Sequence, residues 1–269
     1  MDEPSHKMKA PENHFKKALK DGKTQFGCWL NLADMLGTEI AGRAGFDWVL
    51  IDAEHGPSGI HDILKQLQVL DGLNTSAIVR VPIGETWIIK RVLDAGAQSV
   101  LVPMVETAQE AKSHVRAALY PPIGKRGVGA AVARAAQFGT LTDYLKSAND
   151  QICMIIQLET CSGLDAIDDI LAVDGIDGVF IGPSDLAADM GFLGNPDAPE
   201  VQKSILDALK RIAGSGKAAG ILSLKDSNTN EYLECGALML GVASDVLTLN
   251  QNLRNTANKW CNRMLDPGR

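Results

Sequence analysis

Two acidic side chains follow two consecutive apolar runs of the sequence. Residues 152–156 are apolar and lead into Gln157 and Glu159, and residues 178–181 lead in the same way to Asp185. Glu159 and Asp185 are separated by about the length of one strand–helix unit. Because neighbouring parallel strands lie roughly 4.8 Å apart, the two carboxylates can converge on one hard divalent cation, which prefers oxygen ligands. The spacing therefore predicts a metal site at Glu159 and Asp185. In the alternative reading, Asp185 only caps the helix that follows it.

Short apolar runs alternate with helical patterns along most of the chain. Each run lacks the polar–apolar alternation of a half-exposed strand, which indicates strands buried on both faces of a parallel sheet flanked by helices. The predicted strands are 26–30, 48–51, 77–79, 99–102, 152–156, 178–181, 217–222 and 238–240. The predicted helices are 34–44, 60–70, 86–93, 108–119, 163–171, 201–213, 228–233 and 244–259.

A weak internal repeat supports this alternation. Residues 44–51, 95–102, 174–181 and 235–240 each place a glycine just before a strand, where a helix must end. Glycine tolerates the left-handed conformation that such a helix end requires. Eight units of this kind predict a (β/α)8 TIM barrel, which typically takes about 250 residues. An open doubly wound sheet is the alternative, but no GxGxxG motif follows the first strand.

Composition narrows the class of protein. The net charge of −7 gives no support for a nucleic-acid partner. No apolar run approaches the ~20 residues of a membrane span, and the first residues lack the apolar core of a signal peptide, so we expect a cytoplasmic protein. The scattered cysteines favour free thiols over disulfides or metal ligands. They are Cys28, Cys153, Cys161, Cys235 and Cys261. We expect one barrel domain over 1–269, with a loose arm at 1–11, the barrel at 12–258 and a tail at 259–269.

Polar residues gather where the predicted strands end. The second strand runs into Asp52, Glu54 and His55, the third into Arg80, and the seventh ends at Leu222. Active sites of such barrels lie at the C-terminal ends of the strands. Strand ends can also be polar simply because they meet water, but this mixture of acids, a histidine and an arginine favours a functional site.

Four motifs together resemble one known family. They are Gln157-Leu158-Glu159-Thr160, the Gly-Pro-Ser-Asp-Leu run at 182–186, the Asp-Ala-Glu-His run at 52–55, and the Tyr-Pro-Pro-Ile-Gly-Lys-Arg-Gly run at 120–127. In this order they resemble the HpcH/HpaI aldolases, metal-dependent class II aldolases of pyruvate and related 2-oxo acids. The resemblance covers roughly residues 12–258. It implies a pyruvate-type barrel whose C-terminal helix is exchanged between subunits of a homohexamer, a trimer of dimers.

The resemblance also implies roles for single residues. Glu159 and Asp185 match the family's metal ligands, usually for Mg²⁺, Mn²⁺ or Co²⁺. Arg80 matches the arginine that stabilises the enolate oxygen, although it could instead only bridge to a nearby acid. His55 matches the group implicated in proton transfer, and Asp52 matches the acid positioned near it.

Four further residues of the family site are expected to contact substrate or to complete the site. Gln157 matches a residue beside the bound 2-oxo acid, the amides near Ser184 and Asp185 are expected to hold its carboxylate, and Leu222 is expected to line the substrate site. Asp94 matches an acid contributed across the subunit contact; without the resemblance it is an aspartate poorly placed at a helix C-terminus. No role follows for Glu54.

The reaction implied joins or cleaves a 2-oxo acid and an aldehyde through a metal-stabilised enolate. Residues 120–149 form a long segment after the fourth strand; we expect it over the catalytic mouth, with Arg126 or Arg134 contacting the aldehyde or another subunit. Three alternatives stay open. They are a Schiff-base aldolase using Lys225, an acyl-CoA lyase or cycloadding synthase of the same fold, and a catalytically silent dicarboxylate-binding or scaffold barrel.

Overall fold

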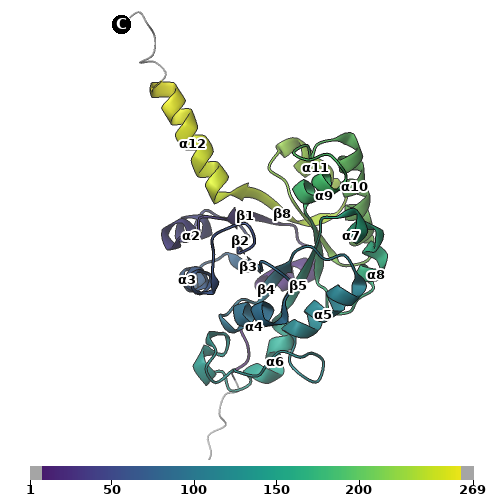
Figure 1. Ribbon diagram of the computed structural model, residues 1–269. Helices are drawn as coiled ribbons and strands as arrows, with labels where there is room; N and C mark the ends of the chain where they lie inside the picture. Colours follow the sequence, from purple (N-terminus) through teal and green to yellow (C-terminus); the bar gives the residue numbers. More distant parts are fainter. Residues whose placement is uncertain (1–7, 262–269) are drawn as a thin grey trace, which may run out of the picture.

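The computed structural model describes residues 8–261 and forms a closed barrel of parallel strands (Figure 1). Each strand pairs with the next along the chain, and the last pairs with the first. The strands are β1 Gln25–Leu30, β2 Trp48–Asp52, β3 Ser76–Arg80, β4 Ser99–Val102, β5 Cys153–Leu158, β6 Gly178–Ile181, β7 Ala218–Leu222 and β8 Ala237–Ser244. The predicted (β/α)8 barrel is therefore confirmed. The parts of the expected arm and tail at 1–7 and 262–269 lie outside the described residues.

Helices follow the strands around the outside of the barrel. They are α1 His14–Lys20, α2 Met35–Gly42, α3 Ile60–Leu70, α4 Thr86–Asp94, α5 Ala108–Ala118, α6 Tyr144–Gln151, α7 Cys161–Asp165, α8 Ile167–Leu171, α9 Pro183–Asp189, α10 Pro199–Gly214, α11 Asp226–Glu234 and α12 Asp245–Trp260, with a 3-10 helix η1 at Arg134–Gly139. The single helix expected over 163–171 is two short helices, because α7 ends before Ala166. The short α6 and η1 were not expected, whereas α9 is the helix expected near Asp185.

Local signals set where several of these elements begin and end. The side chains of Asp34, Thr107 and Ser244 accept hydrogen bonds from first-turn backbone N–H groups of α2, α5 and α12. The repeated glycines that precede strands, Gly45, Gly96, Gly175 and Gly236, all have positive φ, between 88° and 114°. The repeat seen in the sequence therefore marks helix ends that only glycine adopts without strain.

Two apolar layers fill the molecule. The larger layer lies between the strands and the surrounding helices, and the smaller one fills the inside of the barrel. Phe15 and Leu19 of α1 belong to the inner layer, and Phe15 is fully buried. The helix α1 therefore plugs the N-terminal end of the barrel.

An aromatic column connects this plug to the opposite end of the barrel. The ring of Phe15 lies 6.2 Å from that of Trp48, which lies 5.7 Å from Trp29, which lies 5.4 Å from Phe180. These spacings fall in the range of favourable edge-to-face and tilted aromatic pairs. A Cβ at Gly27 would collide with the Trp48 ring, so the column fits only against a bare backbone. Packing of the column therefore fixes the positions of the Trp29 and Phe180 rings.

The segment 120–149 does not lie over the C-terminal end of the barrel of its own chain, so that expectation is wrong. It follows α5 rather than β4 directly, and a helix after a strand returns the chain to the N-terminal end. There, Ser147 and Gln151 accept backbone hydrogen bonds from Ala10 and Asn13, at 2.8 Å each. Figure 1 shows α6 at the end of the molecule away from α12. Arg126 and Arg134 therefore do not line the catalytic mouth within one chain.

Two further expectations concern the whole chain. All five cysteines are free, as expected. No helix within residues 8–261 combines the length and apolar character needed to span a bilayer.

The plug gives a test of the inner core. The variant Phe15→Ala should lower the free energy of unfolding by about 3–5 kcal/mol, because it leaves a cavity beneath Trp48. The matched control His14→Ala, in the same helix with a ring that is 78% exposed, should change it by less than about 0.5 kcal/mol. Urea unfolding followed by fluorescence measures both, and equal midpoints for the two variants would contradict the assignment of α1 as a plug.

Candidate active site

The C-terminal ends of the strands surround a cavity of about 520 Å³. Its lining residues are Trp29, Asn31, Asp52, His55, Arg80, Gln157, Phe180, Gly182, Pro183, Ser184, Asp185, Leu222, Leu224, Ser244, Val246 and Leu247. Seven of the nine candidate residues from the sequence are among them. Glu159 lies directly behind this lining, against Gly182, and Asp94 lies elsewhere.

The pairing of β2 with β3 places Asp52 directly opposite Arg80. Arg80 Nε donates to Asp52 Oδ1 at 2.9 Å and Nη2 donates to Oδ2 at 2.7 Å. Both residues are buried, and Asp52 is fully so. Burial alone would lower the pKa of Arg80, but the hydrogen bonds and charge of Asp52 outweigh it and raise that pKa. The guanidinium is therefore a fixed positive charge at the cavity wall.

Asp52 has no oxygen left for the ring of His55. Its carboxylate also accepts from the side chain of Asn31 at 2.7 Å and from the backbone N–H of Glu54 at 3.1 Å. The backbone N–H of His55, not its ring, approaches Asp52, at 3.4 Å. Asp52 thus accepts hydrogen bonds from Arg80 and from the turn that follows β2, and not from the imidazole of His55.

Asn31 was missed by sequence reasoning. It follows β1, donates to Asp52, and accepts from the hydroxyl of Ser244 at 3.2 Å. Its backbone N–H donates to Asp245 at 2.9 Å. Its place as the first polar residue after β1 was the available signal, and its function is to join β1, β2 and β8 at the cavity.

His55 lines the cavity but keeps a largely exposed side chain, 63% accessible. Its Nε2 lies 4.0 Å from Glu54 Oε2. The same Glu54 oxygen lies 2.8 Å from Arg80 Nη1. The residue without an assigned role in the sequence thus stands between the histidine and the arginine.

Glu159 lies just past the end of β5 and is 1% exposed. Its Oε1 accepts the backbone N–H of Met104 at 2.8 Å, and its Oε2 accepts from the side-chain amide of Gln157. Burial raises the pKa of Glu159 and the charge of Asp185 adds to this, while the two hydrogen bonds oppose the shift. A cation beside these two carboxylates would stabilise their ionised forms.

Gly182 makes the close approach of strands β5 and β6 possible at this point. A Cβ at Gly182 would collide with Glu159 Oε2 and press on the Gln157 amide. Asp185 and Ser184 follow within the first turn of α9, and both line the cavity. No side chain caps α9, so its first backbone N–H groups have no side-chain acceptor. Glu159 and Asp185 therefore follow the neighbouring strands β5 and β6, next to the first backbone N–H groups of α9.

This pair of acids is not part of a larger cluster. Among residues 8–261, no group of three or more His, Cys, Asp or Glu side chains is placed to hold a metal ion. Mg²⁺ commonly binds through one or two carboxylates and keeps other positions for water and substrate. The donor set of Glu159 and Asp185 fits such an ion.

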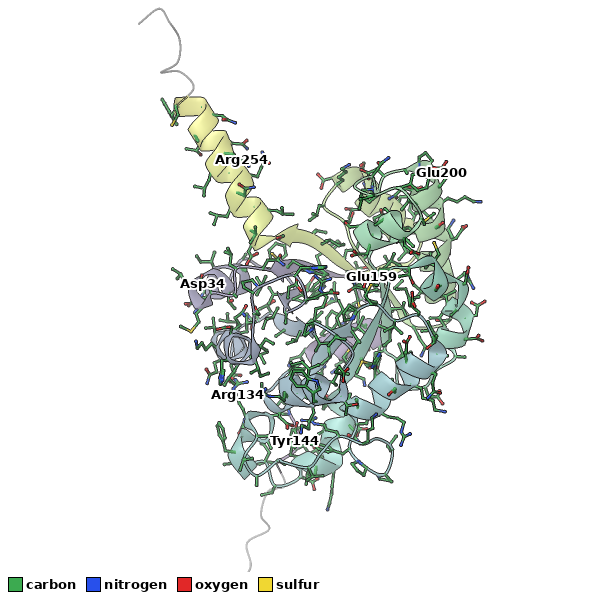
Figure 2. All side chains as sticks on the ribbon, in the orientation of Figure 1. Asp34, Arg134, Tyr144, Glu159, Glu200 and Arg254 are labelled. Atoms are coloured by element: carbon green, nitrogen blue, oxygen red, sulfur yellow. The ribbon has the colours of Figure 1, made fainter. Side chains whose placement is uncertain are left out.

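Asp94 is at the other end of the barrel from this cavity. It ends α4 and accepts from Arg126 Nη2 at 2.7 Å, and the Arg126 side chain is fully buried. The guanidinium of Arg126 also stacks on Tyr120, 4.5 Å from the ring centre. Within one chain Asp94 therefore does not reach the residues that follow β2, β3, β5 and β6. In Figure 2, Arg134 and Tyr144 likewise lie well below Glu159.

The remaining wall of the cavity is apolar. Trp29, Phe180 and Leu222 face it, and the guanidinium carbon of Arg80 lies 5.8 Å from the Trp29 ring centre. Lys225, the alternative Schiff-base residue, is not among the lining residues and forms an ion pair with Asp197. Its side chain is 64% exposed. Lys225 therefore lacks the buried setting that a Schiff-base lysine needs.

Comparison with known proteins agrees with this geometry. The family model for HpcH/HpaI aldolase/citrate lyase matches residues 25–251. The hydroxypyruvate/pyruvate aldolase of Roseovarius nubinhibens is 53% identical over 253 residues, which cover 94% of this chain and 98% of that protein. The 4-hydroxy-2-oxo-heptane-1,7-dioate aldolase of Salmonella dublin is 48% identical, covering 93% and 95%.

The fold is also found in a solved structure of the same family. The HpcH/HpaI aldolase/citrate lyase family protein of Burkholderia cenocepacia superposes with a TM-score of 0.88 at 36% identity, covering 92% of this chain and 98% of that one. Aldolases of this family generally depend on a divalent metal ion. The chain belongs to the HpcH/HpaI aldolase/citrate lyase family and is an aldolase, a carbon–carbon lyase.

Proposed function

We propose that this aldolase forms or cleaves a 4-hydroxy-2-oxo acid, with pyruvate or a related 2-oxo acid as donor and an aldehyde as acceptor. The observation that carries the proposal is the convergence of Arg80, Gln157, Glu159 and Asp185 on one cavity at the strand ends. An acid pair and a fixed guanidinium are what a reaction through an enolate needs. The activities for which the two related aldolases are named agree with this choice of substrate class.

Glu159 and Asp185 would hold the divalent cation. Glu159 Oε2 lies against Gly182, where a Cβ would collide with it, and burial already disfavours the ionised form of Glu159. When bound, the cation supplies Lewis-acid polarisation of the keto oxygen of the substrate. Mg²⁺ and Mn²⁺ suit two carboxylates better than softer metals do.

Substrate binding follows from the same wall. The free amides at the start of α9, near Ser184 and Asp185, accept the carboxylate of the 2-oxo acid, as helix N-termini bind anions. Gln157 lies beside that position and holds Glu159. Leu222, Trp29 and Phe180 give the substrate carbon chain an apolar contact and limit access of water.

Proton transfer involves the opposite wall. Two of the five N–H groups of Arg80 are used on Asp52. The others are free of hydrogen bonds to Asp52 and can stabilise the negative charge that develops on the keto oxygen. His55 takes the methyl proton, so a C–H bond breaks, an N–H bond forms and the electron pair remains on the substrate. The resulting enolate carbon then attacks the aldehyde.

The metal assignment can be tested without relying on turnover. Glu159→Gln and Asp185→Asn should each weaken Mn²⁺ binding, measured by isothermal titration calorimetry, by at least about 100-fold, since each removes one anionic ligand of a hard cation. Asp189→Asn, which changes a carboxylate at the far end of α9, should bind as the wild type does. Wild-type Mn²⁺ affinity in both site variants would refute the assignment.

The role of Arg80 predicts a loss in rate rather than in binding. Arg80→Lys keeps the charge but not the planar fork, and kcat for cleavage should fall by about 10²–10³, as for loss of one oxyanion donor. The exposed Arg43→Lys serves as control, because Arg43 pairs only with Glu39 on the surface of α2. Steady-state kinetics of cleavage of a 4-hydroxy-2-oxo acid would show this; a rise in KM with unchanged kcat would argue for simple substrate binding.

We further propose that α12 docks on a second copy of the chain. The helix projects from the barrel (Figure 1) and none of its residues is buried. Leu249 and Leu253 are 49% and 61% exposed and repeat at helical spacing with Val246. Exposed apolar faces of this kind mark interaction sites. An exchange of C-terminal helices, and an Asp94 supplied from one subunit to the site of another, both fit this proposal.

Disruption of that face should change the assembly. The double variant Leu249→Glu, Leu253→Glu should lower the mass measured by light scattering after size-exclusion chromatography, because buried glutamates are costly at an interface. Glu substitution of Asn250 and Asn252, on the same helix, is the control for added charge. If the apolar-face variant keeps the wild-type mass, α12 does not hold subunits together.

A further inference from the structure

The Glu54 carboxylate lies near two groups that the proposed reaction uses, the guanidinium of Arg80 and the imidazole of His55. Its Oε2 lies 2.8 Å from Arg80 Nη1 and 4.0 Å from His55 Nε2. The side chain is only 14% exposed, and Oε2 is buried without a hydrogen bond from any described residue. One oxygen atom thus faces the guanidinium and the imidazole at once, with its hydrogen-bonding capacity unused.

The other nearby acid cannot take this place. Asp52 is committed to two N–H groups of Arg80, to Asn31 and to the backbone of Glu54. Among residues 8–261, Glu54 is the one carboxylate recorded within 4.0 Å of the His55 ring. If a carboxylate orients that ring and stabilises its protonated form, the geometry selects Glu54 over Asp52.

Burial and the neighbouring charges shift the pKa of the Glu54 carboxyl toward neutral pH. Burial raises the pKa of Glu54 to about 7; the positive charges of Arg80 and of protonated His55 oppose this, whereas Glu159, just past β5, and Asp52 on β2 add to it. These four residues are the charged groups that face it. At neutral pH, Glu54 therefore exchanges between an ionised form that attracts the Arg80 guanidinium and a neutral form that does not.

We propose that Glu54 is a positioning residue, which fixes Nη1 of Arg80 and stabilises the protonated ring that His55 acquires from the substrate. The assignment rests on the proposed function. In the reaction, the proton leaves the substrate methyl carbon for the His55 ring, and the ionised Glu54 stays unprotonated beside the imidazolium. Its attraction for that imidazolium exists only after transfer, so it lowers the barrier rather than strengthening substrate binding.

The test follows proton transfer apart from the aldehyde. Wild type and Glu54→Gln, each with Mg²⁺, are compared for exchange of pyruvate methyl protons in D₂O by NMR and for kcat and KM in cleavage. Glu54→Gln keeps the size of the side chain but removes its charge. We expect exchange and kcat to fall by about 10- to 100-fold, the usual cost of losing such a supporting contact, with KM for the 4-hydroxy-2-oxo acid unchanged.

The pH profile distinguishes positioning from mere packing. The ionised form of Glu54 is the active one, so wild-type kcat/KM should rise with pH through about 7. Glu54→Gln should lose this ascending ionisation. Glu54→Asp, which keeps the charge, should retain it with part of the activity. Glu106→Gln, a carboxylate that does not line the cavity, should match the wild type.

Two results would overturn the assignment. A Glu54→Gln protein that exchanges at the wild-type rate shows that Glu54 is not needed. One that is slower but keeps the ascending ionisation shows that Glu54 is not the titrating group and has a structural role only. If the wild type itself neither exchanges pyruvate protons nor cleaves a 4-hydroxy-2-oxo acid, the proposed function is wrong, and the role of Glu54 is wrong with it. Failure of the Glu54 assignment alone would instead leave the wild type active in both assays.

Discussion

The buried ion pair of Asp52 and Arg80 is the constraint on which the site depends. Register between β2 and β3 puts the two residues opposite each other, and two hydrogen bonds fix the guanidinium in one plane. A buried charge that loses its partner costs about 3–5 kcal/mol, so this pair resists rearrangement. The remaining groups of the site are arranged around the Arg80 guanidinium, whose orientation is fixed.

Negative charge exceeds positive charge at this end of the barrel. Asp52, Glu54, Glu159 and Asp185 surround or approach a site whose only fixed cation within the described residues is Arg80. Burial raises the pKa of both Glu54 and Glu159, so the ionised forms of these two carboxylates are destabilised in the site. A divalent cation at Glu159 and Asp185 would relieve the imbalance, so metal affinity and the raised pKa of Glu54 would be two consequences of one electrostatic arrangement.

The rest of the fold supports the cavity from the N-terminal end of the barrel and extends the helix α12 from the other end. The column from Phe15 to Phe180 supports the apolar floor of the cavity from the plugged end of the barrel. At the other end, α12 leaves the barrel with its apolar residues exposed (Figure 1). The segment 120–149 covers the N-terminal end instead, because every helix reverses the direction set by the strand before it.

The sequence by itself determined the barrel, the glycine-marked helix ends and the strand-end residues, because buried strands and helix caps leave local patterns. It also predicted Glu159, Asp185, Arg80 and His55 as neighbours, since strand ends meet at one face. Only the tertiary structure decided that Asp52 binds Arg80 and not the His55 ring, and that Glu54 faces both. Such choices depend on side-chain directions and on burial, which combine residues from separate strands and have no local signature in the chain.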